Sequence, residues 1–310
     1  MIRAAYLAAD GLAEPLGTEL ARAGVGFSWH GGLALSEQAP VPCAWAQDVW
    51  ASPQEAPAPS IKAAADALRG VQRNWAAVEA PGQHRRMALI AARLPPVRAR
   101  PLPFPAPAPT APLGGWTLLD TDRLLFSATT ASPFPRGECR FAEDRAGPPS
   151  RAYLKAWEAW TLWGEHPEPG ERCIDLGAAP GGWTWAAATL GARVLAVDKA
   201  PLDPGVAALP GVETRLDSAF ALDPAGWADA PFDWLLCDVI AYPARSLALA
   251  ERWIAAGAAR RVLCTVKFQG ETDHDSAAGF AAIPGGRLRH LFHNKHELTF
   301  MWPHATEGKP

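Results

Sequence analysis

From residue 150 onward, short runs of strand length alternate along the chain with longer helical stretches. The strand-length runs are mostly apolar and rich in β-branched residues, which is typical of buried strands in a parallel sheet. They are CIDLGA, RVLAVD, VETRLD, FDWLLCDV and RVLCTVKF, and the helical stretches between them include WTWAAATLG and SLALAERWIAAG. A preceding helix, SRAYLKAWEAWTLW, is expected to have Ser150 as its N-cap. This alternation predicts an α/β fold, a mostly parallel sheet with helices on both faces.

The C-terminal stretch departs from this alternation. RLRHLFH and HELTFMW flank the turn residues Asn294 and Lys295. Two such runs around a short turn predict an antiparallel hairpin, which we expect to close one edge of the sheet.

Before residue 150 the pattern is shorter and mixed. Strand-like pieces at 4–8, 32–35 and 88–92 and helical pieces at 12–23 and 61–68 predict a smaller α+β domain over residues 1–149. WTLLDTDRLLFSATTAS (116–132) predicts a hairpin around the polar residues 120–122. The boundary to the second domain, 150–310, is expected in the stretch AGPPS.

Residues 95–112 contain eight prolines. Proline lacks an N–H donor and favours extended backbone, so neither a helix nor a central strand is expected there. The segment could be a linker or a long loop within one domain, and we favour the loop.

Composition places the chain among globular proteins. Hydrophobic residues make up 49% of it, and none of its apolar runs approaches the length of a membrane span. The N-terminal residues do not resemble a signal peptide, and the five cysteines form no CxxC pair. We therefore expect a cytoplasmic protein with no membrane partner and, by default, a monomer.

The net charge of the chain is −3, but the distribution of charges along the sequence is more informative. Between Glu79 and Asp120 there is no acidic residue. The arginines of this stretch are Arg85, Arg86, Arg93, Arg98 and Arg100. Clustered arginines can bind phosphates of a nucleic acid, although a merely solvated face is an equal alternative at this point.

The stretch IDLGAAPGGWTW (174–185) joins a strand, a glycine-rich turn and the start of a helix. Glycines allow close approach of the backbone to a ligand, and the helix N-terminus offers free N–H groups. The residues expected to hold a cofactor here are Asp175, Gly177, Ala179, Pro180, Gly181, Gly182 and Trp183. Asp198 ends the next strand, 21 residues after Gly177, a spacing at which a carboxylate can accept hydrogen bonds from a ribose.

The type of cofactor follows from the acidic residues. Four aspartates end or closely follow four successive strands: Asp175, Asp198, Asp217 and Asp238. Such an edge would repel the pyrophosphate of a nicotinamide dinucleotide, and the glycines do not follow the GxGxxG pattern. It suits the sulfonium and ribose of S-adenosylmethionine, with Asp217 expected near the adenine.

RVLCTVKF raises a separate question, because an apolar strand ends on Lys267. The chain has six lysines against twenty-three arginines, so lysine is not its usual cation. A strand-end lysine that reaches solvent is the simplest interpretation of this stretch alone.

The motif DLGAAPGGW resembles the signature of the FtsJ-like ribose 2′-O-methyltransferases. SPFPRG, PSRAYLKAWEAW, DLGAAPGGWTW, LLCDVIAYPARSLALAERW and LFHNKHELTFMW resemble, in this order, the bacterial large-subunit ribosomal RNA methyltransferase M family. The resemblance implies a Rossmann-like methyltransferase domain preceded by a THUMP-type RNA-binding region. It also implies methylation of a ribose, that of a cytidine, in 23S ribosomal RNA or a large-subunit precursor.

The resemblance further implies a catalytic tetrad of Lys155, Asp238, Lys267 and Glu297. A partly desolvated lysine near a second lysine has a lowered pKa, so Lys267 is expected to act as the general base toward the ribose hydroxyl. Asp238 is expected to orient it, and Glu297 to hold Lys155 or the ribose. Taken singly, Lys155 could be a solvated helix lysine, Glu297 a hairpin charge and Asp238 a strand cap.

Other functions remain as alternatives or are disfavoured. The nearly neutral N-terminal region leaves another RNA open as the acceptor, and a non-catalytic RNA-binding protein with this fold is a second alternative. His290, His293 and His296 should not converge on a metal, because strand periodicity places the first two on opposite faces. A hydrolase is disfavoured because the chain has no GxSxG motif.

Overall fold

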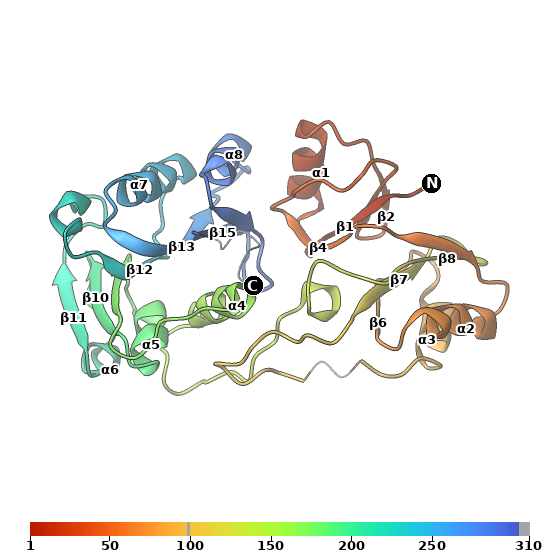
Figure 1. Ribbon diagram of the computed structural model, residues 1–310, viewed down its shortest axis with the longest axis horizontal. Helices are drawn as coiled ribbons and strands as arrows, with labels where there is room; N and C mark the ends of the chain where they lie inside the picture. The colour runs from red at the N-terminus through yellow and green to blue at the C-terminus, as the bar shows by residue number, and fades with distance from the viewer. Residues whose placement is uncertain (98–99, 304–310) are drawn as a thin grey trace. The chain divides into compact units, whose positions relative to one another are not determined.

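The computed structural model describes residues 1–97 and 100–303, and the chain forms two compact units (Figure 1). Unit 1 consists of Met1–Leu102 and Ala108–Arg140, and unit 2 of Pro103–Pro107 and the chain from Phe141 onward. The division therefore falls a few residues before the stretch AGPPS, and the proline-rich segment contributes to both units.

Unit 1 contains two four-stranded sheets, with the strand orders β2-β3-β1-β4 and β5-β8-β7-β6. Its strands are β1 (Ala4–Ala8), β2 (Ser28–His30), β3 (Leu33–Ser36), β4 (Ala46–Trp50), β5 (Gln54–Pro57), β6 (Trp75–Ala77), β7 (Gly114–Leu118) and β8 (Arg123–Ser127). Its helices are α1 (Ala13–Arg22), α2 (Ile61–Val71) and α3 (His84–Ala91), with a short 3-10 turn, η1 (Pro135–Gly137). The expected α+β character and the hairpin β7–β8 are present.

One predicted strand of unit 1 is wrong. Residues 88–92 lie mostly in the helix α3, in which Met87 and Ile90 are buried and Leu89 is exposed. Two buried residues three positions apart lie on one face of a helix, whereas a strand would bury alternate residues. The apolar run ALIAA is too short to distinguish these two periods.

Unit 2 contains a seven-stranded sheet with the order β11-β10-β9-β12-β13-β15-β14. Its strands are β9 (Arg172–Leu176), β10 (Arg193–Asp198), β11 (Val212–Leu216), β12 (Phe232–Cys237), β13 (Ala259–Lys267), β14 (Arg287–Arg289) and β15 (Glu297–Trp302). The first five run parallel, and β15 pairs antiparallel with both β13 and β14. The predicted α/β sheet with an antiparallel edge hairpin is confirmed.

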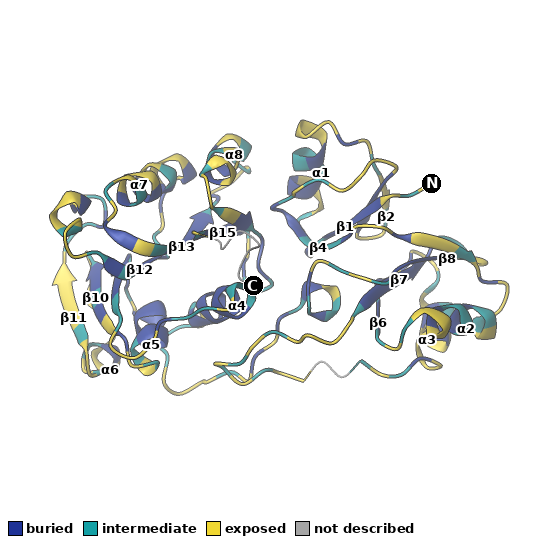
Figure 2. Cartoon of the chain, viewed as in Figure 1, coloured by how far each residue is buried: buried dark blue, intermediate teal, exposed yellow. Residues whose placement is uncertain are grey.

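Helices cover both faces of this sheet. They are α4 (Tyr153–Trp163), α5 (Gly182–Thr189), α6 (Pro204–Ala207), α7 (Pro243–Ala255) and α8 (His274–Ala282), and a 3-10 turn, η2 (Pro224–Trp227), precedes β12. In Figure 1, α4 and α5 lie on one face of the sheet, and α7 and α8 lie on the other. Figure 2 shows the central strands buried and the edge strand β11 exposed. The pattern did not predict α8, whose sequence HDSAAGFAA is rich in small residues.

The helix α4 begins later than predicted. Its N-cap is Ala152, and Ser150 is not the capping residue, although its hydroxyl accepts a hydrogen bond from the Ala152 N–H (3.4 Å). Nine consecutive residues from Tyr153 to Thr161 are buried, including charged ones. Part of this burial comes from the proline-rich segment, since the Phe104 ring stacks on Trp157 at 4.6 Å. A helix buried all round is a core element, not an amphipathic surface helix.

Within the described residues, the helices are too short or too polar to cross a bilayer.

Candidate active site

The glycine-rich turn follows β9 and leads into α5. Gly177 has a φ of +76°, and a Cβ atom there would lie 2.8 Å from the Cα of Val239, next to Asp238. A Cβ on Gly182 would lie 2.8 Å from the hydroxyl of Ser150. Glycine at these two positions therefore lets the chain segments after β12 and before α4 approach the turn.

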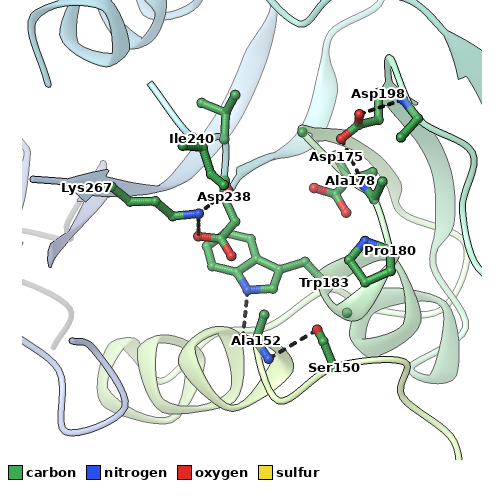
Figure 3. A pocket seen from close by; sticks show the side chains of 15 residues that line it. Ser150, Ala152, Asp175, Ala178, Pro180, Trp183, Asp198, Asp238, Ile240 and Lys267 are labelled. Atoms are coloured by element: carbon green, nitrogen blue, oxygen red, sulfur yellow. Dashed lines mark hydrogen bonds and ion pairs between the residues drawn. The ribbon is translucent and has the colours of Figure 1, made fainter. Parts of the chain in front are cut away.

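A cavity of about 400 Å³ opens at the carboxyl end of the parallel strands (Figure 3). The residues from the turn that line it are Asp175, Gly177, Ala178, Ala179, Pro180, Gly182 and Trp183. Those from other elements are Ser150, Ala152, Asp198, Ala200, Asp238, Val239, Ile240 and Lys267. Parallel strands of an open sheet present their carboxyl ends at one edge, which is where ligands bind in such folds.

Asp175 is one of the buried residues that line this cavity. Its Oδ2 accepts a hydrogen bond from the Thr184 hydroxyl (2.7 Å), while its Oδ1 has no hydrogen-bond partner among the described residues. Burial raises the pKa of this carboxyl to about 7. A buried acceptor without a partner in a cavity wall is suited to a hydrogen-bond donor of a ligand.

Asp198 fixes the turn through two backbone contacts. Its Oδ2 accepts from the Ala179 N–H (3.0 Å) and its Oδ1 from the Ala200 N–H (2.9 Å). Each carboxylate oxygen can accept a second hydrogen bond, so the group remains able to hold a ligand hydroxyl.

Two of the residues expected to contact a cofactor do not line the cavity. Asp217 directs Oδ2 to the guanidinium of Arg215 (2.7 Å), which holds the pKa of Asp217 below its usual value. Gly181 lies against Val206, where a Cβ would be 2.9 Å from the valine Cγ1. The structure therefore gives Gly181 a packing role in the turn.

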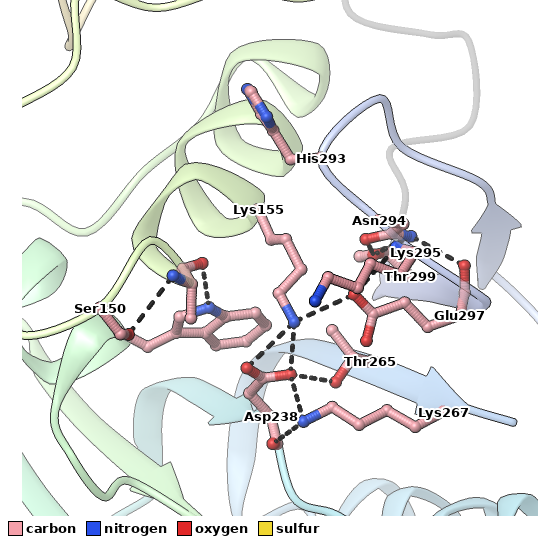
Figure 4. A network of polar contacts seen from close by, with 12 residues as sticks. Ser150, Lys155, Asp238, Thr265, Lys267, His293, Asn294, Lys295, Glu297 and Thr299 are labelled. Carbon is pink, nitrogen blue, oxygen red and sulfur yellow. Dashed lines mark hydrogen bonds and ion pairs between the residues drawn. The ribbon is translucent and has the colours of Figure 1, made fainter. Parts of the chain in front are cut away.

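The four tetrad residues converge beside the cavity (Figure 4). The Lys155 ammonium lies 2.9 Å from Asp238 Oδ1, 3.1 Å from Asp238 Oδ2 and 3.1 Å from Glu297 Oε1. The Lys267 ammonium donates to the main-chain oxygen of Asp238 (2.5 Å) and lies 3.0 Å from its Oδ1. Asp238 thus stands between the two lysines.

Electrostatics distinguish the members of this network. Burial opposes the charge of Lys155, but the carboxylates of Asp238 and Glu297 outweigh it and raise the pKa of Lys155. Burial also opposes the charge of Asp238, yet the two lysines and the Thr265 hydroxyl together lower the pKa of Asp238. Lys155 and Asp238 therefore both stay charged at neutral pH.

Two polar residues of the site were missed by the sequence interpretation. Thr265 donates its hydroxyl hydrogen to Asp238 Oδ1 (2.5 Å). It lies two positions before Lys267 on β13, so strand periodicity could have placed both on one face. Glu158, one turn after Lys155 on α4, accepts hydrogen bonds from the N–H groups of Phe292 (2.8 Å) and His293 (2.9 Å).

The C-terminal histidines have separate environments. His290 Nε2 contacts the carbonyl oxygen of Lys295 (3.1 Å), and His296 Nε2 contacts the Thr272 hydroxyl (2.8 Å). The His293 ring stacks on Phe141. Among the described residues, there is no cluster of metal-ligating side chains.

The arginine cluster of unit 1 is not uniform. Arg85, Arg93 and Arg100 are exposed, whereas Arg86 is half-buried and donates to the carbonyl oxygen of Ala58 (2.7 Å). Arg98 lies outside the described residues. Arg86 therefore has a structural partner, and the other described arginines remain available for phosphates.

Comparison with known proteins agrees with this site. Residues 149–268 match the family model of the FtsJ-like methyltransferases. Over 166 residues the chain is 36% identical to ribosomal RNA large subunit methyltransferase M of Aromatoleum aromaticum, covering 48% of this chain and 44% of that protein. It is also 36% identical over 159 residues to the protein of the same name from Halorhodospira halophila, covering 49% and 46%.

The chain spans about half the length of the curated relatives it matches. Among solved structures, the 1,6-didemethyltoxoflavin-N1-methyltransferase of Burkholderia thailandensis aligns with a TM-score of 0.36 and 19% identity, covering 49% of this chain and 78% of that one. The glycine-rich turn, Lys155, Asp238 and Lys267 all fall within residues 149–268, the part of the chain that matches the FtsJ-like methyltransferase model.

Proposed function

We propose that this protein is an S-adenosylmethionine-dependent methyltransferase that modifies a ribose 2′-hydroxyl in RNA. The observation that carries the proposal is the Lys155–Asp238–Lys267–Glu297 network at the edge of a carboxylate-lined cavity. The names of the curated relatives support 23S ribosomal RNA as the substrate, and we propose a cytidine as the methylated nucleotide.

The cavity fits S-adenosylmethionine better than a phosphate-bearing cofactor. Asp175, Asp198 and Asp238 line it, and the Asp175 Oδ1 has no hydrogen-bond partner in residues 1–97 and 100–303. We propose that the turn at 175–183 holds the amino acid part and that Asp198 accepts hydrogen bonds from the ribose hydroxyls. When bound, S-adenosylmethionine supplies a methyl group activated by a positively charged sulfur.

The two lysines have different parts in this proposal. Lys155, whose pKa is raised between two carboxylates, remains an ammonium and keeps Asp238 and Glu297 together. Lys267 lines the cavity and, among the described residues, contacts a single carboxylate, so it is the better candidate for the base. In this proposal the Lys267 Nζ takes the proton of the ribose 2′-hydroxyl as the methyl group is transferred, and Asp238 orients that Nζ.

The ribose methylation pattern of ribosomal RNA tests this proposal. We expect one 2′-O-methyl group of 23S ribosomal RNA to disappear from cells that lack the gene and to return with the wild-type gene. A Lys267→Ala gene should not restore it. If the methylation pattern of cells that lack the gene equals that of the wild type, the acceptor is another RNA. If the Lys267→Ala gene restores the 2′-O-methyl group, the non-catalytic alternative is favoured.

A further inference from the structure

The loop that leaves the site after Asp238 exposes two large apolar side chains. Ile240 is 77% exposed and Tyr242 is 71% exposed, whereas the residues that follow each of them, Ala241 and Pro243, are buried. Ile240 and Tyr242 are thus both exposed to solvent, with the buried Ala241 between them. Because the fold gains little buried area from either side chain, a contribution to stability does not explain why large apolar residues occupy these two positions.

The backbone of this loop is well anchored. Tyr242 is the extended N-cap residue of α7, and its carbonyl oxygen accepts hydrogen bonds from the N–H groups of Arg245 (2.9 Å) and Ser246 (3.2 Å). At the other end, Val239 packs against Gly177 of the glycine-rich turn. The two apolar side chains are therefore presented by a fixed segment.

The loop is also continuous with the catalytic network. Ile240 lines the same cavity as Asp238 and Lys267, and Figure 3 shows it beside Asp238 at the rim. Four residues of extended chain span at most about 14 Å, so Tyr242 lies within about two nucleotides of any ribose held at Asp238. Arg245, one helical turn further on, is exposed and adds a positive charge, its guanidinium lying 3.7 Å above the Phe220 ring.

We propose that Tyr242, with Ile240 beside it, is the platform on which an unpaired base of the substrate RNA stacks next to the methylated ribose. Sequence-specific RNA recognition targets single strands whose bases stack on aromatic side chains, and a splayed nucleotide is the form in which a ribose can enter a cavity. This inference rests on the proposed function and adds to it how the acceptor strand is held. Tyr242 is thus a positioning residue and takes no part in proton transfer.

Substitution of Tyr242 by phenylalanine, leucine and alanine separates stacking from other roles. The full-length protein is assayed with radiolabelled S-adenosylmethionine and large-subunit ribosomal RNA from cells that lack the gene. We expect Tyr242→Ala to lower kcat/KM for RNA about 5- to 150-fold, mainly through KM, because base stacking is lost. Tyr242→Phe should behave like the wild type, and Tyr242→Leu like alanine. S-adenosylmethionine affinity, measured by calorimetry, should be the same in all four proteins.

Several results would overturn the inference. Unchanged RNA kinetics in Tyr242→Ala, or wild-type kinetics in Tyr242→Leu, would exclude aromatic stacking. A defect seen only on ribosomal particles, and not on naked RNA, would assign Tyr242 to a protein contact instead.

Cross-linking separates this inference from the proposed function. RNA containing 4-thiouridine is irradiated with the wild-type protein, and the adduct is located by mass spectrometry. An adduct at Tyr242 without methyl transfer would preserve the platform while the proposed function fails. Methyl transfer that does not depend on Tyr242 would overturn the platform and leave the proposed function standing.

Discussion

At the scale of single residues, Asp238 contacts two ammonium groups that differ in their surroundings. Within the part of the chain that the structure describes, Lys155 has two carboxylate partners and a 10% exposed side chain, whereas Lys267 has one carboxylate partner and is 20% exposed at the cavity. If Lys267 is the base, Lys267→Ala should leave folding and S-adenosylmethionine binding nearly intact and reduce methyl transfer about 10²- to 10⁴-fold. Lys267→Arg should fail as well, because a guanidinium keeps its proton near neutral pH.

Single-turnover rates and calorimetry on the two variants check this prediction. An active Lys267→Arg protein would show that residue 267 acts only as a positioning charge. Full activity in both variants would return Lys267 to an ordinary strand-end lysine.

A second prediction at the scale of single residues concerns Asp198 and the binding of S-adenosylmethionine. Hydrogen bonds to charged groups contribute about 1.5–3 kcal/mol each, so Asp198→Ala should weaken S-adenosylmethionine binding at least about 10-fold. The matched control is Asp203→Ala, since Asp203 is exposed and caps the short helix α6 without lining the cavity. Titration calorimetry measures both. Unchanged affinity in the Asp198 variant would mean that the ribose binds elsewhere.

At the scale of elements, α4 organises the site from one face. Lys155 holds Asp238 and Glu297, and Glu158 holds the backbone that leads to β15. Burial raises the pKa of Glu158 to about 7 against the opposing effect of its two N–H partners. Because the folded state then binds the proton more tightly than the unfolded state, the free energy of unfolding should fall as pH rises from about 4.5 to about 7.

The titration of Glu158 lowers the free energy of unfolding by about 3 kcal/mol between these two pH values. A Glu158→Gln variant lacks this titrating carboxyl. The free energy of unfolding of the variant should therefore fall less than that of the wild type over the same pH range. Urea unfolding followed by tryptophan fluorescence at a series of pH values measures the difference. Parallel curves for the two proteins would contradict the prediction.

At the scale of the whole molecule, each of the two units has its own buried core, and the carboxylate-lined cavity and the tetrad lie within unit 2. We predict that exposed arginines of unit 1 contact RNA phosphates. Replacing Arg85 and Arg93 together should flatten the slope of log affinity against log salt by about two units. The control is Arg86→Ala, which should lower the stability of unit 1 through loss of its contact with Ala58 and leave the slope largely unchanged.

Filter binding of RNA at several salt concentrations measures these slopes. If the double variant keeps the wild-type slope, the arginines form only a solvated face.

The sequence alone determined the features that depend on local order along the chain. Strand and helix periods specify the parallel sheet, and each aspartate at a strand end is placed by its own strand. Because all parallel strands present their carboxyl ends at one edge, Asp175, Asp198 and Asp238 could be expected to share a cavity. The tetrad was identified through a resemblance, since no single member is distinctive by itself.

Only the tertiary structure decided features that depend on partners distant in sequence. Lys155 looked like a surface lysine because nothing near it in the chain shows that α4 is buried on every side. Glu297 reaches the site because the antiparallel register pairs it with Lys267. Asp217 turns to Arg215, and residues 88–91 form a helix instead of a strand. In each case the deciding free energy comes from burial and charge pairing between separate elements, which local periodicity does not encode.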